Sequence, residues 1–328
     1  MASKIASYQH ICIAMQHGSV IPPFLKPGDT VALVATARFV DETMVETASR
    51  YYTKWGFKVH VHDELLKRNF QLAGSDAHRA NVFNEALQNP SVKAIAVLRG
   101  GYGTVRILDC INAQAYAKCP KWLVGYSDVT VLHCWSQYLG IASIHASMPV
   151  NFDQNTPEAL DSLRAALNGS LTSLKCKGAE GIRNGQCSGK LVGGNLSVLY
   201  SLAGSPYFKV EQGSILFIED LDEHLYHLDR MMMNLKVSGQ LQKCGGIIVG
   251  GMSDMRDNTK EFGFSADNPF GFNAREIIES HTANLHIPVA WGFCAGHIAD
   301  NRAMYLNRHA ELRVEDQSIE LSWSNKEA

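Results

Sequence analysis

The chain has 328 residues, and its 30 Lys and Arg residues face 32 Asp and Glu, which gives a formal net charge of −2. This length exceeds a comfortable single core, so we expect two domains. The charge balance gives no reason to expect nucleic acid or an anionic membrane as a partner, and no apolar run reaches the roughly 18 residues that a membrane span needs.

The first 20 residues contain one short apolar patch, Ile11 to Met15. The patch is too short for the core of a signal peptide, and the segment has no small-residue cleavage site. We interpret it as an extended start of the chain and not as a targeting signal.

From Pro27 to about Asn168, short apolar runs alternate with amphipathic stretches. Strands are predicted at residues 30–36, 58–62, 92–98, 121–124 and 141–144, and helices at 42–55, 76–87, 105–116 and 129–138. This alternation is typical of a parallel sheet covered on both faces by helices. The working site of such a sheet lies at the carboxyl ends of its strands.

Between Asn168 and Gly189 the periodicity lapses into Gly, Ser, Lys and Asn. We therefore predict an α/β domain at residues 1–168, a linker at 169–188 and a second domain at 189–328. The second domain is expected to be mixed and strand-rich. Its predicted helices are 194–203, 226–237 and 273–283, and its predicted strands are 214–218, 245–249, 288–292, 303–306 and 318–321.

Eight cysteines are spread along the chain without a C-x-x-C pair, and several lie inside apolar segments. This distribution is typical of reduced, buried thiols in a cytoplasmic protein. The pairs His60/His62 and His224/His227 bring no obvious third ligand, so we expect no metal and no cofactor.

Ser127 lies in the pentapeptide GYSDV, between a predicted strand and a predicted helix. A serine on such a turn can act as a nucleophile, with the next residue's N–H directed at a developing oxyanion. The usual hydrolase elbow has glycine two positions after the serine, where this chain has Val129. The alternative is that Ser127 caps the helix, a role that serine favours.

The segment Arg99 to Gly103 (RGGYG) directly follows the third strand. Its three glycines permit a close backbone approach to a ligand, so that N–H groups can face an anion. The spacing fits neither the Walker pattern nor the dinucleotide fingerprint. A plain tight turn is the alternative.

Two further motifs supply an acid and a base. Glu219 and Asp220 end an apolar strand, and either could orient a histidine, although paired acids at such a place are often caps or solvated groups. His297 lies in a polar loop (GHIADN) where Asp300 and Asn301 could fix its tautomer or simply shape the turn.

Together these motifs identify a resemblance to the LD-carboxypeptidase family of serine peptidases, the muramoyl-tetrapeptide carboxypeptidases, and to the related microcin C self-immunity proteins. The resemblance runs from Leu25 to about Val314. It includes RGGYG at 99–103, GYSD at 125–128, GGNL at 193–196, FIED at 217–220, DR at 229–230 and GHIADN at 296–301. Members more often carry Pro-Ser near the Ala35–Arg38 stretch, a departure that puts fine substrate preference in doubt.

The resemblance implies Ser127 as nucleophile, His297 as general base and Glu219 as its orienter. It implies an oxyanion hole of backbone N–H groups, which we place at Gly101 and Asp128. It also implies a homodimer, and a flavodoxin-like (class I glutamine amidotransferase-like) first domain with a smaller β-rich second domain.

A carboxypeptidase must also bind the free carboxylate of the residue it releases, and arginine suits this through bidentate hydrogen bonds. The candidates are Arg99, Arg230 and Arg302, with Tyr102 as a further substrate-binding candidate. The sequence does not choose among them, and backbone amides could serve instead.

The leading hypothesis is a cytoplasmic LD-carboxypeptidase that removes the terminal D-alanine from murein tetrapeptides in cell-wall recycling. A second is an immunity hydrolase that cleaves a peptide–nucleotide antibiotic. Such an enzyme needs an aromatic platform for the base, whereas Trp122, Trp135 and Trp291 look more like core residues. A third is a catalytically silent peptide-binding module, which the presence of all three reactive side chains disfavours.

Overall fold

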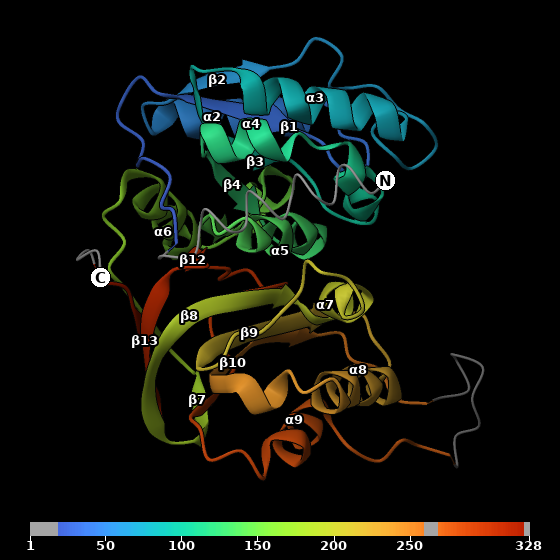
Figure 1. Cartoon of the computed structure of the whole chain (residues 1–328), viewed down its shortest axis with the longest axis vertical. Helices are drawn as coiled ribbons and strands as arrows, with labels where there is room; N and C mark the ends of the chain where they lie inside the picture. The colour runs from blue at the N-terminus through green and yellow to red at the C-terminus, as the bar shows by residue number, and fades with distance from the viewer. Residues whose placement is uncertain (1–18, 259–267, 325–328) are drawn as a thin grey trace. The chain divides into compact units, whose positions relative to one another are not determined.

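The computed structural model describes residues 19–258 and 268–324, and the chain divides into two domains (Figure 1). Of the described residues, the first domain comprises 19–171 and 299–308, and the second comprises 172–258, 268–298 and 309–324. The apolar patch near the N-terminus and Cys12 lie outside the described residues.

The first domain is built on a six-stranded sheet in the order β12-β5-β4-β3-β1-β2, in which only the edge strand β12 is antiparallel. Its strands are β1 (Thr30–Val34), β2 (Lys58–Val61), β3 (Val92–Val97), β4 (Trp122–Gly125), β5 (Ser143–His145) and β12 (Met304–Leu306). Its helices are α2 (Glu42–Lys54), α3 (Asp76–Gln88), α4 (Ala113–Lys118), α5 (Thr130–Tyr138) and α6 (Pro157–Asn168), with 3-10 turns η1 (Thr104–Cys110), η2 (Ser127–Val129) and η3 (Pro149–Gln154).

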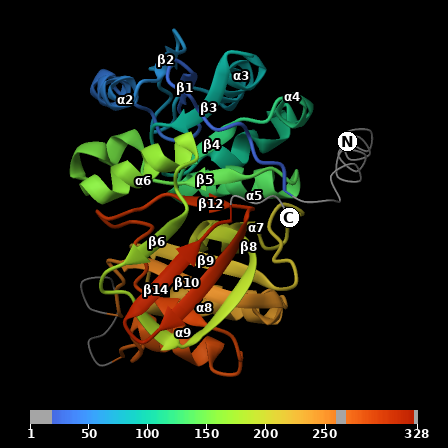
Figure 2. The ribbon, with the colours of Figure 1, turned by 90° about the vertical axis from the view of Figure 1, so that its left-hand side faces the viewer.

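Helices cover both faces of this sheet, as the sequence predicts. Figure 2 shows α2 and α6 on one face and α3 and α4 on the other. The central strands β1, β3 and β4 are almost entirely buried, which explains their nearly continuous apolar sequences.

Two details of the first domain differ from prediction. The helix expected at 105–116 is split into η1 and α4, because Ile111 is extended and Asn112 starts a new helix by accepting the N–H of Ala115 at 3.0 Å. Helix α6 was not predicted. Its start has a local signal, since Thr156 caps it and Pro157 occupies the first turn.

The second domain contains an eight-stranded mixed sheet in the order β6-β14-β13-β8-β9-β10-β11-β7. Its strands are β6 (Ser173–Cys176), β7 (Glu180–Arg183), β8 (Gly185–Asn195), β9 (Ser214–Leu221), β10 (Cys244–Ser253), β11 (Val289–Trp291), β13 (His309–Glu315) and β14 (Ser318–Ser322). Its helices are α7 (Leu196–Leu202), α8 (Leu225–Val237) and α9 (Ala274–Thr282), with the short turn η4 (Leu241–Lys243).

The four central strands β8, β9, β10 and β11 run parallel, so their carboxyl ends share one edge of this sheet. The expected linker at 169–188 differs from the structure, because β6, β7 and the start of β8 occupy most of it. Residues 299–308 also return to the first domain, where β12 pairs with β5. A three-residue edge strand carries little signal of the sheet that it joins.

The expectation that the thiols are reduced is wrong for one pair. Cys176, at the end of β6, and Cys294, after β11, form a disulfide with their Cα atoms 5.5 Å apart. The two residues are 118 positions apart in sequence, and spacing alone does not reveal such a spatial approach. The remaining described cysteines are free thiols: Cys110, Cys119, Cys134, Cys187 and Cys244.

None of the helices in the described part of the chain combines the length and apolarity that crossing a membrane requires.

Candidate active site

Ser127 stands on a strained turn between β4 and α5. Its φ is +62°, a left-handed conformation that L-residues other than glycine adopt at a cost of about 1–2 kcal/mol. The alternative role as a helix cap is not seen, since Val129 precedes α5 and Tyr126 precedes η2. Ser127 is partly exposed, and its hydroxyl forms no hydrogen bond with the described residues of its own domain. This is the backbone geometry of a nucleophile elbow.

The valine at position 129 is accommodated by the glycine at 125. A β-carbon on Gly125 would lie 2.8 Å from Cγ2 of Val129, and the φ of Gly125 is +155°. The elbow therefore places its small residue before the serine, and the bulky residue after the serine fills the space thus left open.

His133 holds the strand end that leads into the elbow. Its Nε2–H donates to the carbonyl of Gly125 at 2.9 Å, and the hydroxyl of Ser143 donates to its Nδ1 at 2.8 Å. The ring is buried, and burial lowers its pKa to about 4, so it stays neutral. The sequence analysis did not single out His133, because one histidine within an apolar helix is no signal of such a role.

The glycine turn lies directly beside Ser127. A β-carbon on Gly100 would lie 3.3 Å from Oγ of Ser127. The backbone N–H groups of Gly101 and Asp128 have no acceptor within the described residues of this domain, so both are available to an oxyanion.

The side chain of Asp128 ties the elbow to this turn. Its Oδ2 accepts the backbone N–H of Thr104 at 2.9 Å, and Oγ1 of Thr104 lies 2.8 Å from Oγ1 of Thr36. Burial raises the pKa of Asp128, and the hydrogen bonds from Thr104 oppose that shift. The carboxyl thus fixes the spacing between the two segments that flank Ser127.

In the second domain, Glu219 and His297 are in direct contact. Nδ1–H of His297 donates to Oε2 of Glu219 at 2.7 Å, and its backbone N–H donates to the same oxygen at 3.1 Å. Burial lowers the pKa of His297, but the charge and hydrogen bond of Glu219 outweigh burial, so its pKa is raised above the ordinary 6.5. With Nδ1 protonated, Nε2 carries the lone pair that a general base needs.

This contact depends on the topology and on Gly296. Glu219 lies near the end of β9 and the His297 loop follows β11, both at the carboxyl edge of the parallel strands. A β-carbon on Gly296 would lie 2.7 Å from Cβ and Oε2 of Glu219, and the φ of Gly296 is +104°. The loop is also held by Ser253, whose hydroxyl donates to the His297 carbonyl at 2.8 Å.

Asp220 points away from this pair, as expected for consecutive residues of a strand. It accepts hydrogen bonds from Nδ2 of Asn195 at 2.8 Å and from the backbone N–H of Ser197 at 2.9 Å. Burial and the charge of Glu219 raise its pKa to about 7. Asp300, the other acid considered, pairs with Arg302 at 2.9 Å.

The substrate-binding candidates fall in both domains. In the first, Arg99 lies 5.6 Å from the ring centroid of Phe39, and Tyr102 is 55% exposed on the glycine turn. Arg302, also in the first domain, is engaged by Asp300. Arg230 is exposed on α8 of the second domain, 5.6 Å from the ring of Tyr226.

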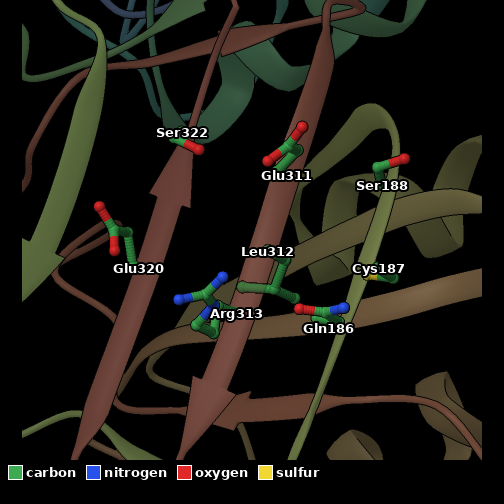
Figure 3. A pocket seen from close by; sticks show the side chains of 8 residues that line it. All are labelled: Gln186, Cys187, Ser188, Glu311, Leu312, Arg313, Glu320 and Ser322. Carbon is green, nitrogen blue, oxygen red and sulfur yellow. The ribbon is translucent and has the colours of Figure 1, made fainter.

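A hollow of about 450 Å³ lies on the second domain, and neither Glu219 nor His297 is among its lining residues. Figure 3 shows its lining side chains on the neighbouring strands β8, β13 and β14. Burial raises the pKa of Cys187, its only thiol, to about 11, so that thiol stays protonated and is a poor nucleophile. In residues 19–258 and 268–324, no group of three or more His, Cys, Asp or Glu could hold a metal ion.

Comparison with known proteins assigns both domains to one family. Residues 31–146 match the model of the LD-carboxypeptidase N-terminal domain, and residues 188–312 match that of the LD-carboxypeptidase C-terminal domain. A probable murein peptide carboxypeptidase of Bacillus subtilis is 30% identical over 90% of this chain and 92% of its own length. The chain belongs to the LD-carboxypeptidase family.

Solved structures agree with this membership. The muramoyltetrapeptide carboxypeptidase of Oxalobacter formigenes superposes with a TM-score of 0.80 at 27% identity, over 91% of this chain and all (100%) of that one. An MccF-like protein of Bacillus anthracis shares the fold, with a TM-score of 0.81 at 22% identity over 93% of this chain and 100% of that one. As a member of the family, the protein is a carboxypeptidase of the serine class.

Proposed function

We propose that this LD-carboxypeptidase hydrolyses the L,D amide bond of murein tetrapeptides and releases the terminal D-alanine in cell-wall recycling. The observation that carries the proposal is Ser127, held at a φ of +62° on a strand-to-helix turn beside a glycine-rich segment. The names of the relatives in Bacillus subtilis and Oxalobacter formigenes supply the substrate class.

In the proposed reaction, Oγ of Ser127 attacks the carbonyl carbon of the scissile amide while Nε2 of His297 takes the hydroxyl proton. The negative charge on the carbonyl oxygen is met by the N–H groups of Gly101 and Asp128. Such donors can lower a barrier by about 3–4 kcal/mol. Glu219 keeps the ring of His297 in the tautomer that accepts at Nε2 and stabilises the imidazolium.

The tetrahedral intermediate then collapses, and His297 gives its proton to the departing amine of D-alanine. Water hydrolyses the acyl-serine by the same route in reverse. Ser127 belongs to the first domain and His297 to the second, so the reaction requires that the two side chains meet in the working enzyme.

The proposal extends to the architecture and the setting. The strand order of the first sheet, with β2-β1-β3-β4-β5 parallel, supports a flavodoxin-like first domain. We further propose a homodimer acting in the cytoplasm, both taken from the family resemblance. Sedimentation of the purified chain tests the first point, and fractionation of cells tests the second.

Hydrolysis of a peptide–nucleotide antibiotic is the second candidate, favoured by the shared fold of the MccF-like protein. It requires an aromatic surface for the base. Trp122 and Trp135 are fully buried in the first domain, and only Trp291 of the three tryptophans considered is partly exposed. The burial of Trp122 and Trp135 therefore favours murein peptides over a peptide–nucleotide antibiotic as the substrate. A silent binding module is disfavoured by the Glu219–His297 contact, which binding alone does not need.

The test is incubation of the protein with a murein tetrapeptide, followed by mass spectrometry for loss of D-alanine. Ser127→Ala should abolish the loss without unfolding the protein. Retained turnover in that variant rejects Ser127 as nucleophile. Cleavage of an aspartamide–nucleotide conjugate, with the tetrapeptide left intact, would establish the immunity reaction instead. Binding of the tetrapeptide without turnover would establish the silent module.

A further inference from the structure

Three arginines gather beside the glycine turn of the first domain. Arg38 follows β1, Arg68 follows β2 and Arg99 follows β3. The guanidinium carbon of Arg68 lies 3.8 Å from the ring centroid of Phe39, and that of Arg99 lies 5.6 Å from the same centroid. Arg38 is the residue immediately before this phenylalanine. We call Arg38, Arg68 and Arg99 the arginine cluster.

The arginine cluster has no counter-ion in the described part of the chain. No carboxylate forms an ion pair with any of its three members, although Arg68 and Arg99 each donate to a backbone carbonyl. The other arginines of the same domain that lie before residue 300 all pair with aspartates: Arg50, Arg79, Arg106 and Arg164. Like charges held together without partners do not stabilise a fold, so the positive potential here suits an anionic ligand.

Arg38 is the member tied most directly to the nucleophile's surroundings. Its backbone N–H donates to the carbonyl of Gly100 at 3.4 Å. Its side chain is exposed and runs over the next glycine, since a β-carbon on Gly101 would lie 2.7 Å from Cδ of Arg38. Gly100 in turn approaches Oγ of Ser127. One glycine therefore faces the nucleophile and its neighbour carries the stem of an exposed guanidinium.

The positions of Arg38 and Arg99 in the sheet also favour the binding of an anionic ligand. Strands β1 and β3 are parallel neighbours, and the chain leaves β1 toward β2 on one side but leaves β3 toward β4 on the other. Ligands of open α/β sheets bind outside the carboxyl ends of the strands at such a reversal of strand order. Arg38 and Arg99 are the charged side chains that follow these two strands.

We propose that Arg38 determines specificity by binding the free C-terminal carboxylate of the peptide, with Arg68 and Arg99 adding to the positive potential around it. The inference rests on the proposed function, because it assigns the carboxylate-binding group of that same site. A guanidinium presents two parallel N–H donors to a planar carboxylate, which matches this task. A phosphate could use the same donors, and the experiment separates the two ligands.

The experiment compares two tetrapeptides that differ only at the C-terminus, one with a free carboxylate and one with a carboxamide. We expect wild-type protein to cleave the free acid with a kcat/KM about 10–100-fold higher than the amide, the worth of one charge-assisted bidentate contact. Arg38→Met should lose that factor on the free acid and cleave both peptides alike. Arg38→Lys should recover part of the preference, since lysine keeps the charge but not the fork.

Arg164→Met is the matched control, because it removes one exposed positive charge from α6 of the same domain, where Arg164 forms an ion pair with Asp161. It should leave the preference for the free acid unchanged. Circular dichroism of each variant verifies the fold. The inference is overturned if Arg38→Met keeps the preference, or if it slows cleavage of both peptides equally.

A separate measurement tests whether the arginine cluster binds phosphate. If wild-type protein cleaves the two peptides equally well, and adenosine monophosphate inhibits it far more strongly than it inhibits Arg38→Met, the cluster binds phosphate and the inference is wrong. If wild-type protein releases nothing from either peptide, the proposed function is rejected, and the inference that rests on it is rejected as well. A working enzyme without the preference overturns the inference alone.

Discussion

Oε2 of Glu219 accepts two hydrogen bonds from His297, one from the ring Nδ1–H at 2.7 Å and one from the backbone N–H at 3.1 Å. A single oxygen therefore fixes both the position of the loop and the tautomer of the ring. The second contact is to the backbone of the loop. Loss of the charge of Glu219 should therefore affect mainly the ring of His297, whereas loss of the whole side chain should also release the loop.

Glu219→Gln tests the charge. A general base works when neutral, so activity rises with pH through the pKa of His297, which Glu219 raises above 6.5. Removing the charge should move the acid limb of kcat/KM to lower pH and lower the plateau by about two to four orders of magnitude. Glu223→Gln, at the separate pair with His227, should leave the limb in place. Wild-type turnover in the Glu219 variant would mean that Glu219 does not orient His297.

Ser127→Gly and Ser127→Ala should both be inactive but differ in stability. The left-handed conformation at 127 strains alanine as it strains serine, whereas glycine adopts it freely. We expect Ser127→Gly to have a free energy of unfolding about 1 kcal/mol above that of Ser127→Ala, measured by urea denaturation. Equal stabilities would mean that the serine is not strained.

Gly296→Ala should disrupt the contact between Glu219 and His297. The added methyl meets Cβ and Oε2 of Glu219 and imposes an unfavourable φ, so one of the partners must move. We expect a loss of about 1–3 kcal/mol of stability and a fall in kcat larger than any change in KM. Gly204→Ala in the same domain is the control, because a β-carbon there meets nothing within 4 Å. Wild-type kcat in Gly296→Ala would show that the loop tolerates the shift.

His133 should make the stability of the first domain depend on pH. Its pKa in the folded state is about 4, below the 6.5 of an exposed histidine, so between these values the unfolded chain binds the extra proton. Its contribution is complete above pH 6.5 and is lost as the pH falls toward 4. The loss at pH 5 relative to pH 7 is about 2 kcal/mol.

The measurement for His133 is urea unfolding followed by the fluorescence of tryptophan, with wild-type protein and His133→Asn at both pH values. The difference in stability between the two proteins should shrink by that amount at pH 5. The exposed His309→Asn should show no such change. A difference that is constant with pH would mean that His133 is not held neutral by burial.

Elements with strong periodicity were predictable, and so was the layered α/β arrangement of the first domain. Ser127, Glu219 and His297 could be proposed from the sequence because each is a reactive residue type near a predicted strand end, where a parallel sheet gathers its functional groups; their roles stay predictions. The family membership, predicted from spaced motifs, is confirmed by the matches to both domain models.

Other features had no local signal. Arg38 becomes notable only through its contact with Gly101 and the absence of an ion pair to a carboxylate among the described residues, neither of which a pattern along the chain encodes. The return of residues 299–308 to the first sheet and the pairing of Cys176 with Cys294 depend on tertiary folding for the same reason. The sequence singled out Asp128 only for its backbone N–H, yet its carboxyl links the elbow to Thr104.

The Cys176–Cys294 bond places a covalent anchor three positions ahead of His297, the proposed general base. Surroundings rich in glutathione keep such sulfurs apart as thiols, whereas oxidising surroundings keep them joined. The redox state of the place where this chain resides therefore decides whether the His297 loop is tethered to the sheet edge or held there by hydrogen bonds and packing alone.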